Sequence, residues 1–124
     1  MKISLNSILI GVSDIRKAVP FYEAVFGVKF TEVRPPFSCF TMNDIEFNVE
    51  EISPERPSGW SQKYLGTAKP IGLEVENADE FLKLVVTNGG KIISPASDKS
   101  WGWREAEFSD PDGNTFIIEQ KIEN

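Results

Sequence analysis

Apolar residues along the chain recur with the spacings of strands and helices, in an order that occurs twice. Residues 7–12 are mostly apolar and β-branched and predict a strand. Over 15–26 apolar side chains recur at helical spacing, which predicts a helix that Ser13-Asp14 can cap and Gly27 ends. Pro20 removes a backbone donor within this run, so we expect a shortened or kinked helix.

Three more strands follow in the first half of the chain. They are predicted at 28–33, 37–42 and 45–52, with Asn43-Asp44 as the hairpin turn between the last two. Residues 53–69 contain several prolines and glycines and show no sustained period, so they predict a long connecting loop. The order in the first half is therefore β-α-β-β-β.

The second half repeats this order. A strand is predicted at 71–75, and a helix at 78–88 begins after Asn77 and ends at Gly89-Gly90. Further strands are predicted at 91–94, 104–109 and 115–120, and the Asp-Pro-Asp-Gly-Asn sequence at 110–114 is typical of a tight turn between the last two.

Three landmarks of the two halves are separated by one constant offset. Val75 stands 63 positions after Val12, as Asn77 does after Asp14 and Gly90 after Gly27. A repeated offset is stronger evidence for an internal repeat than any single motif is. The sequence therefore predicts an α+β fold of two βαβββ modules within a single domain, 1–124. The modules cover about 5–52 and 70–122.

The net charge and the cysteine content limit which classes of function the protein can have. The net charge is -6 and the basic residues form no patch, which disfavours a nucleic-acid partner. The charge would attract a cationic ligand, although such acidity also commonly serves solubility alone. Cys39 is the only cysteine, so no internal disulfide forms. We see neither a signal peptide nor a membrane span and expect a cytoplasmic protein without a membrane partner.

The opening and closing motifs resemble the vicinal oxygen chelate superfamily, which contains glyoxalase I, extradiol dioxygenases, and fosfomycin and bleomycin resistance proteins. The opening segment 8–14, Phe21-Tyr22 and Gly27 carry the resemblance, together with the stretch from Trp-Gly-Trp-Arg-Glu at 101–105 through the turn at 110–114 to Ile118-Glu119. The closing stretch is most similar to the bleomycin-resistance-like branch. The resemblance implies a cleft enclosed by two curved sheets, and a homodimer, in some members with exchanged strands or modules.

Metal-dependent members of this superfamily hold a divalent ion with two histidines and one or two glutamates. By resemblance the histidine positions fall on Ser7 and Pro70, the chain contains no histidine, and Glu119 stands at the last ligand position. Glu46, Asn48 and Glu50 are the candidates in the first module, and the register of 45–52 is open. Because such ions prefer nitrogen or sulfur donors, we expect no catalytic metal and no other cofactor.

Aromatic side chains near a cleft can stack on planar rings or cover cations, which makes Trp60, Trp101 and Trp103 ligand candidates. Packing in the core or in a dimer is the alternative. If the stretch around Gly102 is extended, Trp101 and Trp103 point the same way. The full set of ligand-binding candidates is Phe37, Phe40, Asn48, Trp60, Trp101, Trp103, Arg104 and Glu119.

Glu119 shares strand parity with Thr115 and Ile117. The resemblance, rather than this alternation, favours a position in a partly apolar cleft, and a surface carboxylate on the other face is the alternative. In the cleft the carboxylate would hold a proton more tightly or need a partner such as Arg104. Arg104-Glu105 could orient a ligand, but a simple strand ion pair is favoured.

The leading hypothesis is a metal-free binding protein that sequesters a small organic ligand, cationic or aromatic, such as a drug or a metabolite. The first alternative is a metal-independent isomerase or lyase-like enzyme that uses Glu119 as general base. A metal-dependent lyase or dioxygenase and a purely structural dimerisation module are further alternatives. The sequence does not identify the ligand.

Overall fold

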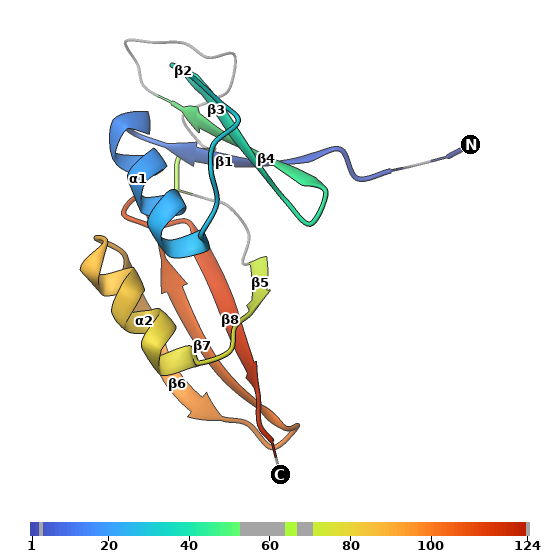
Figure 1. Ribbon diagram of the computed structural model, residues 1–124, viewed down its shortest axis with the longest axis vertical. Helices are drawn as coiled ribbons and strands as arrows, with labels where there is room; N and C mark the ends of the chain where they lie inside the picture. The colour runs from blue at the N-terminus through green and yellow to red at the C-terminus, as the bar shows by residue number, and fades with distance from the viewer. Residues whose placement is uncertain (3, 53–63, 67–70, 124) are drawn as a thin grey trace. The chain divides into compact units, whose positions relative to one another are not determined.

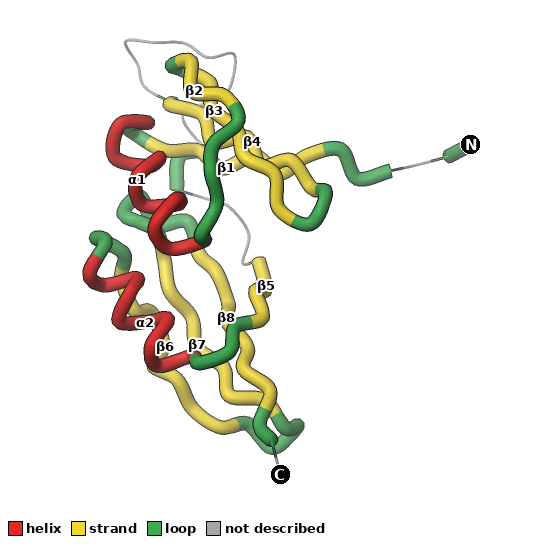
Figure 2. Tube along the Cα trace, viewed as in Figure 1, coloured by secondary structure: helices red, strands yellow, loops and turns green. Residues whose placement is uncertain are grey.

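The chain forms two compact units, residues 1–68 and 69–124. The computed structural model describes residues 1–2, 4–52, 64–66 and 71–123 (Figure 1). Within these residues no helix is both long and apolar enough to span a bilayer. Each unit holds one helix and one four-stranded sheet (Figure 2).

Each unit has the order β-α-β-β-β. The first contains β1 (Ser7–Val12), α1 (Ile15–Phe26), β2 (Glu32–Arg34), β3 (Phe37–Met42) and β4 (Ile45–Glu51). The second contains β5 (Ile71–Glu74), α2 (Ala78–Thr87), β6 (Lys91–Asp98), β7 (Trp103–Ser109) and β8 (Thr115–Lys121).

The two sheets have the same topology. Their strand orders are β1-β4-β3-β2 and β5-β8-β7-β6. In each, the first strand pairs parallel with the last and the other pairs are antiparallel. The predicted α+β fold of two βαβββ modules is confirmed.

The predicted strand 28–33 is wrong, because β2 covers only Glu32–Arg34. Of the preceding residues, Thr31 still donates its amide to Cys39 O of β3 at 2.9 Å, whereas Phe30 closes the end of α1. The amide of Phe30 donates to Glu23 Oε2 of α1 at 3.1 Å, and the Phe30 ring packs 5.1 Å from that of Phe40. The apolar pattern of this segment therefore reflects packing over the helix end.

The strand predicted at 91–94 is longer, since β6 extends to Asp98 through Pro95. β6 lies at the edge of its sheet, and its pairing with β7 shifts register twice, between Ile92 and Ser94 and between Ser94 and Ser97. Proline is tolerated in edge strands and bulges because the missing donor breaks no ladder. The other predicted strands and the two helices agree with the structure to within one residue.

Pro20 neither shortens nor ends α1, which runs unbroken over its 12 residues. Pro20 and Arg16 both lie on the exposed side of the helix. The Arg16 carbonyl, which Pro20 cannot bond, is thus on the side that water reaches. The predicted ends are confirmed: Asp14 accepts from the Arg16 amide at 2.9 Å, and Gly27 has a φ of 67°.

A stacked phenylalanine pair lies at the centre of each core. Phe40 of β3 stacks on Phe47 of β4 with ring centroids 4.9 Å apart, and Phe108 of β7 stacks on Phe116 of β8 at 5.2 Å. Each pair is directly opposed across its strands. The two modules therefore repeat the same core contact as well as the same topology.

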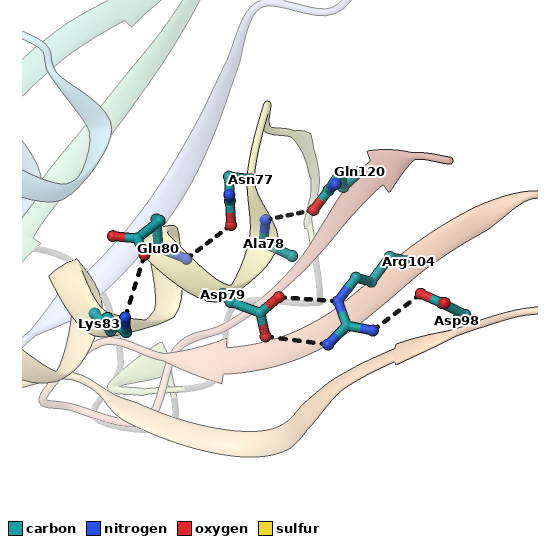
Figure 3. Close-up of polar contacts among 8 residues, drawn as sticks. All are labelled: Asn77, Ala78, Asp79, Glu80, Lys83, Asp98, Arg104 and Gln120. Atoms are coloured by element: carbon teal, nitrogen blue, oxygen red, sulfur yellow. Dashed lines mark hydrogen bonds and ion pairs between the residues drawn. The ribbon is translucent and has the colours of Figure 1, made fainter. Parts of the chain in front are cut away.

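The last strand of each module caps the first N–H of the helix. Glu51 Oε2 accepts from the Ile15 amide at 3.2 Å, and Gln120 Oε1 accepts from the Ala78 amide at 2.8 Å. These amides lack intrahelical partners, so a side chain from the sheet satisfies each and ties the helix to it. Asn77 adds its own cap by accepting from the Glu80 amide at 3.0 Å (Figure 3).

The tight turn predicted at 110–114 is present and organised around the buried carboxylate of Asp110. This side chain accepts from the amides of Asp112 and Asn114, both at 2.9 Å, and from Asn114 Nδ2 at 2.8 Å. Asp110 is 1% exposed and Asn114 is fully buried. The turn is thus a structural unit that fixes how β7 continues into β8.

Arg104 joins helix α2 to the β6–β7 hairpin. Its guanidinium donates to both oxygens of Asp79, Nε at 3.0 Å and Nη2 at 3.1 Å, and to Asp98 Oδ1 at 2.9 Å (Figure 3). The hydrogen bonds from Arg104 lower the pKa of Asp79 below its usual range. Those to Asp79 and then Asp98 raise the pKa of Arg104.

Replacing the buried carboxylate in Asp110→Ala should lower the free energy of unfolding by about 2–4 kcal/mol, because three hydrogen bonds are lost and buried Asn114 keeps polar groups without their acceptor. Urea unfolding followed by circular dichroism measures this. Asp112→Ala, in the same turn, leaves these bonds in place and should cost much less. Equal losses in the two variants would contradict the role given to Asp110.

The Asp79–Arg104 pair should stabilise the protein at neutral pH and fail in acid. Because the pKa of Asp79 is lowered in the folded state, its contribution is present above the unfolded-state pKa and is lost as pH falls through the folded value. The unfolding free energies of wild type and Asp79→Asn in urea should differ most near neutrality and converge as the pH falls below the usual range of an aspartate. A difference that stays constant over this range would show that the charge of Asp79 is not its cause.

Candidate functional site

Strand alternation divides each sheet into a face that packs on its own helix, the helix-side face, and an opposite face, here called the helix-distal face. In the first sheet Phe40 and Phe47 lie on the helix-side face. Phe37 and Asn48 therefore lie on the helix-distal face, Asn48 directly opposite Cys39. Phe37 is 42% exposed, with the Arg34 guanidinium 5.9 Å from its ring centroid.

The pairing with β1 fixes the register of the 45–52 strand. Glu46, Asn48 and Glu50 all have the same parity, so all three lie on the helix-distal face, opposite Ser7, Leu9 and Gly11 of β1, respectively. Glu50 is buried, at 6% exposure, beside a glycine.

Gly11 is where residues 64–66 approach β1. Gly66 N donates to Gly11 O at 3.1 Å, and a Cβ added at Gly11 would lie 2.9 Å from the carbonyl carbon of Tyr64 and 2.7 Å from Ile52 Cδ1. No larger residue fits without displacement. Glycine at this position thus allows the chain to run along β1 past the buried Glu50.

Two predicted ligand residues lie on the helix side. Phe40 has no exposed surface and packs against Tyr22, Phe26 and Phe30 as well as Phe47. Arg104 is bound to Asp79 of α2, so it is not the partner expected for Glu119, and it does not form the expected ion pair with Glu105. Both have structural partners, and we leave them out of the candidate ligand set. Trp60 lies outside the described residues.

Glu119 lies on the helix-distal face of the second sheet. Its neighbours in sequence, Ile118 and Gln120, face the core and the α2 N-terminus. Glu119 Oε1 is 3.2 Å from the position that a Cβ of Gly72 would occupy. The missing side chain at Gly72 therefore leaves room for this carboxylate above β5.

Three carboxylates form a row across this face. Glu119 of β8 is directly opposite Glu74 of β5 on one side and Glu105 of β7 on the other. Neighbouring strands are about 4.8 Å apart, so the backbones of Glu74 and Glu105 are roughly 10 Å apart. Like charges on directly opposed residues repel, and a cation placed along the row would relieve that repulsion.

Trp101 and Trp103 lie on this same face, for a reason other than the predicted one. The stretch is not extended, because Trp101 is in the β6–β7 turn and Gly102 has a φ of 91°. Trp103 opposes Lys121 and shares parity with Glu105. Trp101 joins them because its Nε1 donates to Glu105 Oε2 at 3.0 Å.

A pocket of about 180 Å³ opens on the second sheet beside this row. The lining combines two carboxylates, one ammonium group, a hydroxyl and apolar groups. Its residues are Ser94, Pro95, Lys99, Glu105, Ala106, Glu107 and Ile117. A small ligand with both charged and apolar groups would match this lining.

The donor set does not suit a divalent transition metal. The chain has no imidazole, and Ser7, at one of the histidine positions, offers only a hydroxyl. Pro70, at the other, lies outside the described residues. Among those described, no three His, Cys, Asp or Glu side chains are grouped so that they could hold an ion. The carboxylates lie in a row and do not converge on a point. Absence of a catalytic metal stays a prediction.

Sequence reasoning missed Glu74, Glu107 and Lys99 and gave Glu105 a different partner. Glu105 and Glu107 could have been found from alternation, since they share parity with Trp103 on one strand. Glu74 could not, because it belongs to the row only through the pairing register of β5 and β8.

Comparisons with known proteins agree with this architecture. The chain is 31% identical over 122 residues to lactoylglutathione lyase of Escherichia coli O157:H7, covering 91% of this chain and 90% of that protein. It is 26% identical over 128 residues to the bleomycin resistance protein of Geobacillus stearothermophilus, covering 91% and 93%.

Among solved structures, a glyoxalase-related enzyme from Fulvimarina pelagi superposes with a TM-score of 0.82 at 19% identity, covering 97% of this chain and 89% of that one. The family model described as Glyoxalase/Bleomycin resistance protein/Dioxygenase superfamily matches residues 4–118. The chain therefore belongs to the glyoxalase/bleomycin resistance protein/dioxygenase superfamily.

Proposed function

We propose that this protein binds a small organic cation with a flat, apolar part on the helix-distal face of its second sheet, without a catalytic metal. The observation that carries the proposal is the row Glu74, Glu119 and Glu105, with two tryptophans on the same face. Carboxylates favour a cationic group and indole rings favour flat or cationic groups. Sequestration of a drug or metabolite is the matching biological role, in line with the bleomycin resistance relative.

The charge of the whole chain supports the same ligand class. A net charge of -6 attracts cations over distances of about a Debye length, roughly 8–10 Å at moderate salt. The apolar lining by Pro95 and Ile117 would bury the uncharged part of the ligand. Charge would thus bring the ligand to the face, and apolar contact would retain it.

A second candidate is a metal-independent isomerase or lyase-like enzyme with Glu119 as general base. Its support is the placement of Glu119 over Gly72, where a carboxylate has room to meet a substrate. Lactoylglutathione lyase among the relatives is consistent with this chemistry. Turnover that survives chelation and disappears in Glu119→Gln would favour the enzyme, whereas binding without turnover would favour sequestration.

N-methylquinolinium, a flat monocation, should bind the protein more tightly than neutral quinoline of nearly the same shape. Glu119→Gln should weaken binding of the cation about two- to fivefold, the effect of one exposed charge pair. Isothermal titration calorimetry at low salt measures both affinities.

The matched control is Glu80→Gln, which makes the same change in net charge on α2, where Glu80 pairs with Lys83. It should leave the affinity nearly unchanged. Equal affinity for quinoline and its cation, or equal losses in the two variants, would count against a specific cation site on this face.

Chelator-treated protein should show no rise in thermal midpoint with micromolar zinc, nickel, manganese or ferrous iron, because the described side chains supply no grouped donors. Differential scanning fluorimetry with each metal tests this. A rise in the thermal midpoint at micromolar metal would overturn the metal-free proposal and favour a metal-dependent lyase or dioxygenase.

A further inference from the structure

The Trp-Gly-Trp-Arg-Glu motif contains one contact that neither the fold nor the proposed ligand face requires. Trp101 is 62% exposed, yet its indole N–H donates to Glu105 Oε2 at 3.0 Å. An exposed indole on a turn would otherwise be free to change rotamer. Because Glu105 stands on the helix-distal face, the hydrogen bond to its carboxylate holds the indole toward that face.

The backbone around Trp101 forms a sharp turn with open space beside Gly102. Gly102 N donates to Lys99 O at 3.3 Å, and Gly102 has a φ of 91°, so the chain turns sharply at this point. An added Cβ at Gly102 would meet no atom within 4 Å, so the space around the turn is open. In this open turn, the hydrogen bond to Glu105 is the contact that holds the indole N–H.

Two adjacent residues of β7, the strand that follows the turn, bond to residues in or next to the turn on opposite faces of the sheet. On the helix side Arg104 bonds to Asp98, the last residue before the turn, and to Asp79 of α2. On the helix-distal side the next residue, Glu105, bonds to Trp101. Adjacent residues on β7 point to opposite faces, so together they hold both the hairpin and its tryptophan.

We infer that Glu105 is a positioning residue, which holds the Trp101 indole toward the helix-distal face, the face of Trp103, so that a ligand meets an aromatic side chain that is already oriented. The purpose of this arrangement rests on the proposed function. The positioning itself does not, since it is a property of the protein without ligand. Holding a ring in place before binding reduces the ordering that a ligand must otherwise impose, and tryptophan has only two side-chain torsions to fix.

Nuclear magnetic resonance of the indole N–H groups tests the positioning in the full chain. The Trp101 signal is assigned by its disappearance in Trp101→Phe. Glu105→Leu, close in size but without an acceptor, should bring faster hydrogen exchange and a lower heteronuclear NOE at the Trp101 indole. Glu105→Gln, whose amide oxygen can still accept, should retain most of the protection.

Glu107→Leu is the matched control, because Glu107 lies on the same face two residues further along β7. It should leave the Trp101 indole unchanged. If Glu105→Leu does not fold, Glu105→Asp replaces it, since the shorter carboxylate would not reach the indole. An unchanged Trp101 signal in a folded Glu105→Leu or Glu105→Asp variant, or the same change in Glu107→Leu, would overturn the inference.

Binding of N-methylquinolinium separates the inference from the proposed function. If both hold, Glu105→Leu should lose more affinity than Glu105→Gln, because both variants lose the charge and only the first releases Trp101. The wild-type protein could fail to bind the probe while the indole signals of the variants change as expected. That result would contradict the proposed function and leave the positioning role of Glu105 in place. Equal affinity losses would overturn the link between Trp101 position and binding.

Discussion

The register of the last strand in each module determines both the attachment of the helix and the face on which a carboxylate lies. Glu51 and Gln120 accept the first N–H of their helices, while Glu50 and Glu119, one residue earlier, lie on the helix-distal face. A slip of one residue in either strand would exchange these positions. The attachment of the helix and the placement of the carboxylate thus depend on the same strand register.

Much of the fold was predictable because its signals are local. The caps Asp14 and Asn77 directly precede apolar runs with helical spacing. The residues at 110–114 favour a tight turn by their own backbone preferences and hydrogen bonds. The exceptions were Phe30, whose apolar side chain covers a helix end, Pro95, which an edge strand accommodates, and Pro20, which the exposed side of α1 accommodates. In each, the position of the residue in the folded module decided the outcome.

The candidate site was less predictable because it depends on which residues face each other across strands. Parity alone placed Glu119 with Ile117, but its neighbours Glu74 and Glu105 come from two other strands. Arg104 was misjudged for the same reason, since its partner Asp79 stands 25 positions earlier on α2. Trp101 reached the predicted face through a hydrogen bond, whereas an extended backbone was expected. The pairings of Glu74 with Glu119 and of Arg104 with Asp79 join distant segments of the chain and leave no local pattern.

The turn that joins β7 to β8 has a consequence for the order of folding. All the hydrogen bonds of the Asp110 carboxylate described above are made within five residues, so the turn can form before distant segments meet. From it the hairpin can pair outward residue by residue, bringing Glu105 opposite Glu119 by local contacts alone. Two of the three carboxylates in the row would then be aligned early, and Glu74 would join only when the parallel strand β5 docks.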